Sequence, residues 1–268
     1  MDAKSPHIDL DPELAYDSIA DQYDLFTAHH DYDAWLDSLI PALESHGLSG
    51  RRMLDAGCGT GKSSLPMLRR GWEVTACDYS AAMLAQLDAK SRGEIRTVHA
   101  DLRDLGELGR FDLVLCLGDV LNYCAATTPL ATVLAGLRRN LAETGLLLFD
   151  LNTLTTYRTF YAETQTVEAG PRTVIWRGLG DGRAEPGTRA EAVMEIHSGD
   201  DAEPTRAIHS QRHRGEAEVR GALEASGLEC LDVSGHGFDG ILQRPLDEDL
   251  HTKAIYIAKA RNHEEKRR

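Results

Sequence analysis

Between residues 51 and 150, short apolar runs alternate with stretches whose apolar residues recur at helical spacing. Alternation of this kind is typical of repeated strand–helix–strand units, which build a parallel sheet through right-handed crossovers. It therefore predicts an α/β fold around a doubly wound, mostly parallel sheet. The expected strands are Arg52 to Ala56, Glu73 to Cys77, Ile95 to His99, Phe111 to Leu117 and Gly145 to Phe149.

The segment before this core, residues 1–50, predicts a helical cap. Its first helix should carry Tyr16 and Tyr23 on one face, because the two lie at helical spacing with apolar neighbours. A second helix is predicted around Trp35 to Leu43, which Pro41 should kink or end one turn early.

The segment after the fifth strand changes character. Residues 154–214 contain strand-like pieces, among them 173–177 and 208–214, separated by turn-rich sequence. We interpret them as an inserted antiparallel β lid over the acceptor site, the place where the small molecule on which the protein acts would bind. Helical and strand patterns return afterwards, so residues 51–153 and 215–268 together are predicted to form the core.

Composition narrows the classes of partner. The formal net charge of -14 argues against nucleic acid, because an acidic surface repels phosphates. No apolar run approaches the roughly 20 residues of a membrane helix, and the first residues resemble neither a secretory signal nor a transit peptide. We expect a cytoplasmic protein with a small-molecule acceptor and no membrane partner. Exposed edges of the lid would also allow a homo-oligomer.

The five cysteines show no metal-binding or paired spacing. Their number is odd, and most lie in apolar runs that predict strands. We therefore expect buried thiols and no metal site.

A glycine-rich turn, Leu54-Asp-Ala-Gly-Cys-Gly-Thr-Gly61, ends the first strand and opens a helix. Glycines at this position let a ligand approach the backbone closely. Their G-x-G-x-G spacing differs from the G-x-G-x-x-G of dinucleotide sites, which disfavours a nicotinamide cofactor. A tight connection with no ligand remains the alternative for the turn taken alone.

Two aspartates follow the next strands in positions that suit an adenosine. Asp78 comes directly after the second strand, where a carboxylate can accept both ribose hydroxyl protons. Asp101 follows the third strand, where a carboxylate can accept from an adenine amino group and a backbone N–H can reach a ring nitrogen. The alternative for Asp78 is a helix-capping role, which can coexist with ribose binding.

These motifs resemble class I S-adenosylmethionine-dependent methyltransferases over residues 12–153, and the family's fold is a Rossmann-like sheet. Within that family the chain looks most similar to small-molecule N-methyltransferases, including glycine N-methyltransferase and bacterial enzymes that methylate amino sugars and antibiotics. The segments that carry the resemblance are LDAGCGTG, ACDYSAAML, ADLRDL, FDLVLCLGDVLNY and GLLLFDLNT, with Asp31-Tyr-Asp-Ala-Trp35-Leu and Cys116-Leu-Gly118-Asp close to the glycine enzyme.

The resemblance implies S-adenosylmethionine as the cofactor, with Tyr16 and Tyr23 closing over it and Met83 beside the adenine ring. Aromatic faces also suit a sulfonium cation. The glycine enzyme's arginine between these helices is replaced by Thr27-Ala-His29-His30 here. The cofactor residues implied are Tyr16, Tyr23, Asp55, Gly57, Gly59, Gly61, Asp78, Tyr79, Met83, Asp101, Leu102 and Leu117.

Candidates for the acceptor side lie at the carboxyl ends of the fourth and fifth strands, where open sheets bind ligands. They are Asp119, Asn122 and Tyr123 after the fourth strand and Asn152 after the fifth. Loop and capping chemistry is the alternative for each of them. A hydroxyl acceptor would also need a base, for which the chain offers Asp119, Asp150, His209, His213 and His236.

Three functions compete on this sequence. The first is methyl transfer to an amine of a small molecule in natural-product biosynthesis, either of an antibiotic or of an amino sugar. The second is O-methylation on the same scaffold. The third is a noncatalytic module that binds S-adenosylmethionine, and a nicotinamide dehydrogenase is a weaker rival.

Overall fold

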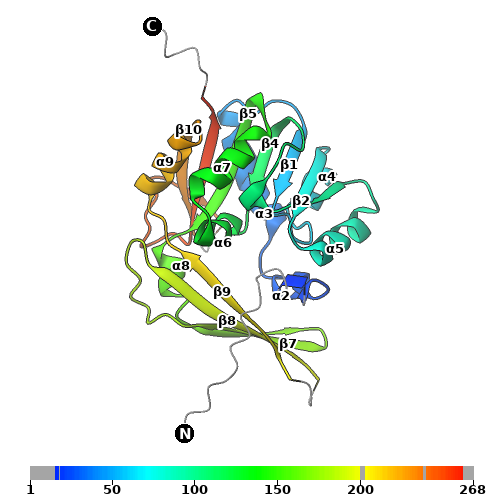
Figure 1. Ribbon diagram of the computed structural model, residues 1–268, viewed down its shortest axis with the longest axis vertical. Coiled ribbons are helices and arrows are strands. Elements are labelled where there is room, and N and C mark those ends of the chain that lie inside the picture. The colour runs from blue at the N-terminus through cyan, green and yellow to red at the C-terminus, as the bar shows by residue number, and fades with distance from the viewer. Residues whose placement is uncertain (1–15, 18, 200–202, 238–239, 262–268) are drawn as a thin grey trace.

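The computed structural model describes residues 16–261, apart from residues 18, 200–202 and 238–239. Two sheets organise these residues: an eight-stranded sheet, and a four-stranded sheet that lies below it in Figure 1. The α/β class and the separate antiparallel sheet predicted from the sequence are both confirmed.

The large sheet has the strand order β11-β10-β12-β5-β4-β1-β2-β3. Strands β1 to β5 pair in parallel, whereas β12 runs antiparallel to both β5 and β10. The mostly parallel, Rossmann-like sheet is therefore confirmed. Its strands are β1 (Arg52–Ala56), β2 (Glu73–Asp78), β3 (Arg96–His99), β4 (Phe111–Cys116), β5 (Leu141–Asn152), β10 (Leu228–His236), β11 (Leu242–Gln243) and β12 (Lys253–Ala260).

Strand β5 is longer than the expected 145–149 because its two neighbours continue the ladder in both directions. Phe111 of β4 pairs with Leu141 at one end, and Lys253 of β12 pairs with Asn152 at the other. The extension carries Asp150 and Asn152 into the same carboxyl edge as the end of β4.

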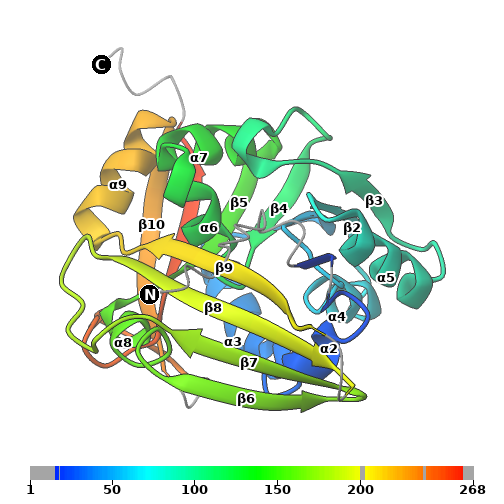
Figure 2. The ribbon, with the colours of Figure 1, turned by 60° about the horizontal axis from the view of Figure 1, so that its bottom comes forward.

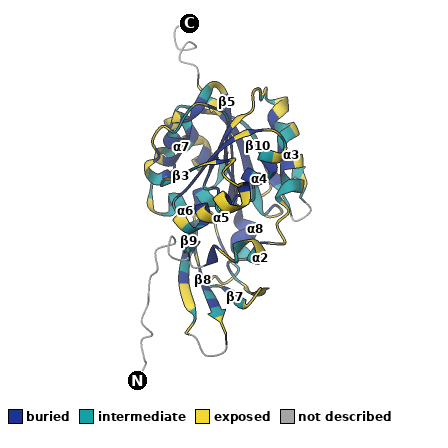
Figure 3. Ribbon diagram, turned by 90° about the vertical axis from the view of Figure 1, so that its right-hand side faces the viewer, coloured by how far each residue is buried: buried dark blue, intermediate teal, exposed yellow. Residues whose placement is uncertain are grey.

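Helices cover both faces of the large sheet, and Figure 3 shows buried strands between more exposed helices. One apolar cluster joins the sheet to α6, α7 and α9, and another joins it to α3, α4 and α5. Alternating strand residues supply the two clusters, because successive side chains point to opposite faces. The helices are α3 (Tyr32–Ser45), α4 (Ser64–Arg69), α5 (Ala81–Ser91), α6 (Val120–Thr127), α7 (Leu130–Arg139) and α9 (Glu216–Ala225).

The expectation that Pro41 ends or kinks its helix early is wrong for the end, because α3 continues to Ser45. Proline removes one N–H bond to the preceding turn. Leu39 and Leu43 are fully buried on either side of it, and Asp31 caps the helix by accepting from Ala34 N at 3.0 Å. Packing and capping therefore hold the helix across the missing bond.

Much of the first predicted helix lies outside the described residues. Within them, Tyr16 and Asp17 are helical, and a short helix α2 spans Tyr23–Phe26. This helix packs against the edge of the small sheet.

The small sheet has the order β6-β7-β8-β9 and is antiparallel throughout. It follows α8 (Leu154–Arg158) and crosses below the carboxyl ends of the large sheet, with β9 nearest to α6 (Figure 2). We call it the lid sheet. Its strands are β6 (Thr164–Ala169), β7 (Arg172–Gly178), β8 (Arg189–Ser198) and β9 (Thr205–Arg212).

Alternation gives the lid sheet one buried face. On β8 this face carries Ala190, Ala192, Met194 and Ile196, which join a third apolar cluster with Trp176 of β7. None of the helices that the structure describes is long and apolar enough to cross a membrane.

Candidate cofactor and acceptor site

A cavity of about 570 Å³ is lined by residues at the carboxyl ends of β1, β2 and β4 and by residues of the lid sheet. Open α/β sheets bind ligands at this edge. Ten of the twelve cofactor residues implied by the resemblance line the cavity. Two of them, Tyr16 and Tyr23, belong to the N-terminal segment. The other eight lie at or after the strands of the large sheet: Gly57, Gly59, Asp78, Tyr79, Met83, Asp101, Leu102 and Leu117.

The glycine turn presents bare backbone to this cavity. Gly57 has a φ of +77°, and a Cβ there would meet Val120 Cγ1 at 2.6 Å. Gly59 also has a positive φ, of +53°, but a Cβ there would meet no atom within 4 Å. The space above Gly59 is therefore open to a ligand, whereas Gly57 is required by packing against α6.

Gly61 and Asp55 do not line the cavity. A Cβ on Gly61 would come within 2.3 Å of Leu87 Cδ1, so this glycine permits the close approach of α5. Asp55 is buried and accepts hydrogen bonds from the Ser63 and Ser64 hydroxyls. Burial raises the pKa of Asp55 to about 6, against these hydrogen bonds. Both residues therefore stabilise the glycine turn without lining the cavity.

Asp78 joins the glycine turn to the next helix. Its carboxylate accepts from Gly59 N at 2.8 Å and from Ser80 N at 2.9 Å, and the residue is 7% exposed. Burial raises the pKa of Asp78, while these backbone hydrogen bonds act to lower it. The carboxylate faces the cavity and keeps lone pairs for further donors.

Asp101 lines the cavity in contact with Arg103. The guanidinium Nε lies 2.9 and 2.8 Å from the two carboxylate oxygens, and it also lies over the Tyr79 ring. Burial acts to raise the pKa of Asp101, but the hydrogen bonds and charge of Arg103 outweigh it and lower the pKa overall. Arg103 was not predicted from the sequence and lines the cavity beside Asp101.

Aromatic rings close the opposite side. Tyr16 lies edge-on to both Tyr23 and Tyr123, with ring centroids 6.1 Å apart in each pair. Tyr32 adds a further ring, with the Lys62 ammonium 5.4 Å from its centroid. These rings offer π faces to a cation bound between them.

Lys62 supplies positive charge at the glycine turn. Its Nζ donates to Thr27 Oγ1 at 3.0 Å and also to the Thr27 carbonyl. Burial lowers its pKa, against the attraction of Asp24. Lys62 therefore brings a cation to the stretch around Thr27, where the sequence lacks the arginine of the glycine enzyme.

On the acceptor side, Asp119 lies at the junction of the core and the lid sheet. It has a φ of +55°, directly after Gly118. Its Oδ2 accepts from Gln211 Nε2 at 2.6 Å and from Asn152 Nδ2 at 3.1 Å. Its Oδ1 lies 3.5 Å from Lys253 Nζ. One carboxylate oxygen is thus held by two amides and the other faces the Lys253 ammonium.

Lys253 links Asp119 to a second, fully buried carboxylate. Asp150 is 0% exposed and lies 2.9 Å from Lys253 Nζ. It also accepts from Gly118 N at 2.6 Å and Asp119 N at 3.0 Å, which fixes the turn after β4. Burial lowers the pKa of Lys253, but Asp119 and Asp150 raise it more, so the net shift is upward.

Asn122 and Asn152 are buried and do not line the cavity. Asn122 donates to the Tyr157 hydroxyl at 3.0 Å and accepts from Asn152 N at 3.0 Å. Asn152 instead reaches Asp119 and Gln211. Their predicted role in positioning the acceptor stays a prediction, and any such role would act through the contact of Asn152 with Asp119.

Tyr123 does line the cavity, and His209 of β9 contacts the Tyr123 side chain. The Tyr123 hydroxyl is 3.0 Å from His209 Nδ1, and the histidine is 1% exposed between Tyr16 and Trp176. Burial lowers the pKa of His209 to about 4, so the imidazole is neutral at physiological pH.

This burial predicts a loss of stability in acid. Between pH 6.5, the ordinary histidine value, and about pH 4, the unfolded chain takes up a proton at His209 that the folded chain excludes. Stability should therefore fall with pH through this window. We expect His209→Asn to reduce the difference in unfolding free energy between pH 7 and 4.5 by on the order of 2 kcal/mol. Urea unfolding measures it, and an unchanged difference would contradict a neutral, buried His209.

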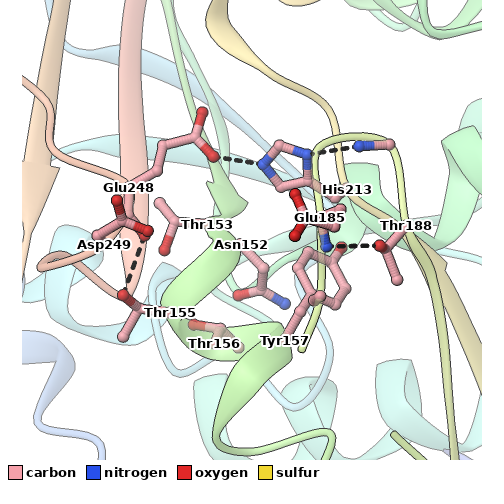
Figure 4. A network of polar contacts seen from close by, with 12 residues as sticks. Asn152, Thr153, Thr155, Thr156, Tyr157, Glu185, Thr188, His213, Glu248 and Asp249 are labelled. Atoms are coloured by element: carbon pink, nitrogen blue, oxygen red, sulfur yellow. Dashed lines mark hydrogen bonds and ion pairs between the residues drawn. The ribbon is translucent and has the colours of Figure 1, made fainter. Parts of the chain in front are cut away.

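The other two candidate histidines lie away from the cavity. His213 Nδ1 accepts from Gly187 N at 3.1 Å and its Nε2 contacts Glu248, a network drawn in Figure 4. It thereby ties the loop between β7 and β8 to the segment before β12. His236 packs its ring against Trp35.

The residues present fit S-adenosylmethionine. Asp78 suits the ribose hydroxyls and Asp101 the adenine amino group, and open space lies over Gly59. Lys62 supplies a cation for a carboxylate, and the tyrosines supply π faces for the sulfonium. Among the residues that the structure describes, no cluster of three histidine, cysteine or acidic side chains is placed to hold a metal ion.

Comparison with known proteins agrees with this geometry. The sequence matches the family described as "Methyltransferase domain" over residues 53–145, the stretch that holds the glycine turn, Asp78 and Asp101. The matched residues, 53–145, include nearly all of β1, strands β2 to β4 and the start of β5. The predicted resemblance to S-adenosylmethionine-dependent methyltransferases is thus confirmed, and the domain supports S-adenosylmethionine as the cofactor.

Three similar proteins extend beyond this domain. The chain is 28% identical to a cypemycin N-terminal methyltransferase of Streptomyces sp., over 84% of this chain and 91% of that one. Its fold matches an S-adenosylmethionine-dependent methyltransferase from Clostridium acetobutylicum with a TM-score of 0.73, 22% identity, and 92% and 100% coverage. It also matches the sugar N-methyltransferase KedS8 from Streptoalloteichus sp. with a TM-score of 0.66, 20% identity, and 98% and 97% coverage.

The methyltransferase domain also has relatives at higher identity over shorter stretches. Two proteins named as methyltransferases, from Geobacillus sp. and Bacillus subtilis, are each 34% identical to the chain over 52% of its length. The chain spans only 58% and 56% of their respective lengths.

Several residues of the site were missed in the sequence. Gln211 carries a weak signal, because it alternates with His209 on a strand whose other face is less buried. Lys62 follows the glycine turn directly, and Tyr32 follows the cap of its helix, but neither position marks a ligand contact by itself. The missed residues are Tyr32, Lys62, Arg103, Gln211 and Lys253.

Proposed function

We propose that the protein is a methyltransferase that uses S-adenosylmethionine to methylate an amine of a small molecule. The observation that carries the amine is Asp119, which follows β4 between Gly118 and Val120, two residues that line the cavity together with five tyrosines. A carboxylate among aromatic rings suits an ammonium or amine better than a neutral hydroxyl.

Bound S-adenosylmethionine would supply an electrophilic methyl carbon on its sulfonium. The protein's part is alignment and exclusion of water, which in-line transfer requires. Asp78, Asp101 and Lys62 would fix the cofactor, and the Asp119 carboxylate would accept an N–H of the acceptor. Tyr16 and Tyr23 would close the cavity over the reacting atoms.

The amine needs a free lone pair, so an ammonium must lose one proton before it reacts. Asp119 lies between Gly118 and Val120, which line the cavity, and its carboxylate would accept a hydrogen bond from the acceptor nitrogen. The histidine closest to the site, His209, is a weak base because burial lowers its pKa to about 4. A hydroxyl acceptor needs a stronger base than Asp119 or His209, so these groups favour an amine.

We further propose that the acceptor is an antibiotic or an amino sugar. The names of the similar proteins, which include a cypemycin N-terminal methyltransferase and a sugar N-methyltransferase, support it. O-methylation remains the second candidate. The expected cytoplasmic location and a homo-oligomer through the lid edges belong to the same proposal.

Methyl transfer to paired acceptors tests the function. Glucosamine should be methylated and glucose should not, and phenethylamine should be methylated where phenethyl alcohol is not. The measurement is release of S-adenosylhomocysteine. Equal or faster transfer to the alcohols would favour O-methylation, and no binding of the cofactor would refute the proposal.

A further inference from the structure

A second cavity, of about 530 Å³, adjoins the cavity that fits the cofactor. It is lined by Tyr157 of α8, by residues of the loop that joins β7 to β8, and by the first residues of β8. Arg189 and Glu191, which point to the same face of β8, line both cavities. The two cavities therefore meet at these two residues.

The loop that lines the second cavity, residues 179–188, is held to the rest of the chain by hydrogen bonds. Arg158 Nε of α8 donates to the Ala184 carbonyl at 2.8 Å. At the far end of the loop, Gly187 N donates to His213 Nδ1 at 3.1 Å, as Figure 4 shows. The cavity is thus a fixed feature of the fold.

Two arginines of this cavity differ from most others in the chain. Among the arginines that the structure describes, only Arg92, Arg183 and Arg189 make no hydrogen bond, ion pair or ring contact through the side chain. Arg183 and Arg189 both line the second cavity, whereas Arg92 lines neither cavity. The donors of a guanidinium match the oxygens of a phosphate or a carboxylate, so two unpaired guanidinium groups favour an acid group as the ligand.

Two acidic residues line the same cavity and narrow the choice of ligand. Asp181 Oδ1 accepts from Arg183 N at 3.0 Å, so this carboxylate is engaged within its own loop. The Glu191 side chain has no hydrogen bond or ion pair with any residue that the structure describes. These carboxylates repel an isolated anion, but a ligand that carries both an acid group and an amine meets a partner of opposite charge for each group.

We propose that the second cavity binds an acid group of the acceptor, a phosphate monoester or a carboxylate, at Arg183 and Arg189, with Glu191 beside the amine. The inference rests on the proposed function. It narrows the acceptor to an amine whose acid group lies several bonds away, because the two groups bind in adjoining cavities.

Rates of methyl transfer to glucosamine 6-phosphate and to glucosamine test this inference, because the two acceptors differ only in the phosphate. The variants Arg183→Met and Arg189→Met remove the guanidinium, and Arg189→Lys keeps the charge without the planar fork of donors. Arg92→Met is the matched control, because Arg92 is also unpaired but lines neither cavity. Release of S-adenosylhomocysteine gives kcat and KM for each acceptor.

We expect the wild-type KM for glucosamine 6-phosphate to be roughly tenfold or more below that for glucosamine, because the phosphate gains charged hydrogen bonds. Arg183→Met and Arg189→Met should each raise the KM for the phosphate toward that for glucosamine, with kcat little changed. Arg189→Lys should lose less, and Arg92→Met should match the wild type. The KM for glucosamine should stay the same in every variant, which a general loss of structure would not allow.

Equal wild-type KM values for the two acceptors would overturn the inference, and so would variants that lose both acceptors alike. Inorganic phosphate distinguishes an acid group of the acceptor from a separate anion. It should not change transfer to glucosamine, and a change that Arg189→Met abolishes would assign the site to a free anion and overturn the inference.

Calorimetry separates this inference from the proposed function. Glucosamine 6-phosphate should bind to the full chain saturated with S-adenosylhomocysteine, and the absence of binding would overturn the inference. Binding that Arg189→Met weakens, without methyl transfer to either amine, would refute the proposed function and support the site.

Discussion

Replacing Asp78 with alanine should weaken the binding of S-adenosylhomocysteine at least roughly a hundredfold. The carboxylate is the acceptor predicted for two ribose hydroxyls, and hydrogen bonds to a charged group contribute about 1.5–3 kcal/mol each. It also accepts from Gly59 N at 2.8 Å, so its loss frees the turn under the ligand. Calorimetric titration of the full chain measures the change.

Two further variants separate ribose binding from collapse of the turn. Asp78→Asn keeps the size and one acceptor oxygen, and it should bind with an affinity between those of the wild type and Asp78→Ala. Asp104→Ala removes an exposed carboxylate nearby and should change nothing. Binding by Asp78→Ala within twofold of the wild type would contradict the ribose assignment.

Lys253→Met should lower the free energy of unfolding by about 3–5 kcal/mol, the usual cost of leaving a buried charge without its partner. Asp150 is 0% exposed and would keep only its two backbone donors, Gly118 N and Asp119 N. Urea denaturation at pH 7 measures the loss. Cofactor binding should weaken with it, because Gly118 lines the cavity.

Lys259 offers a matched control on the same strand. Its side chain is 46% exposed and lies 3.5 Å from Glu229, so Lys259→Met should cost less than about 1 kcal/mol. Equal effects of Lys253→Met and Lys259→Met would show that the pair with Asp150 contributes little.

The parallel core could be predicted because each of its strands is a local signal, an apolar run followed by a helical repeat. The full length of β5 depends on tertiary contacts that a local signal does not show. The strand extends to Asn152 because Asn152 pairs with Lys253 of β12, a residue far away in sequence. The same holds for α3, which continues past Pro41 because buried leucines flank it.

The residues on the cofactor side of the cavity could be predicted from the sequence better than those on the acceptor side. Gly59, Asp78 and Asp101 each sit at the end of a predicted strand, so the edge of the sheet brings them together. Gln211 and Lys253 reach Asp119 from the lid and from β12, across long stretches of chain. Nothing local in the sequence specifies those contacts.

Transfer of a labelled methyl group tests the central claim most directly. The full chain would be incubated with methyl-¹³C S-adenosylmethionine and glucosamine, and the product examined by carbon NMR. The account predicts an N-methyl resonance that disappears in Asp78→Ala and is absent when glucose replaces glucosamine. An O-methyl resonance from both sugars, or a chain that fails to bind S-adenosylmethionine, would contradict it.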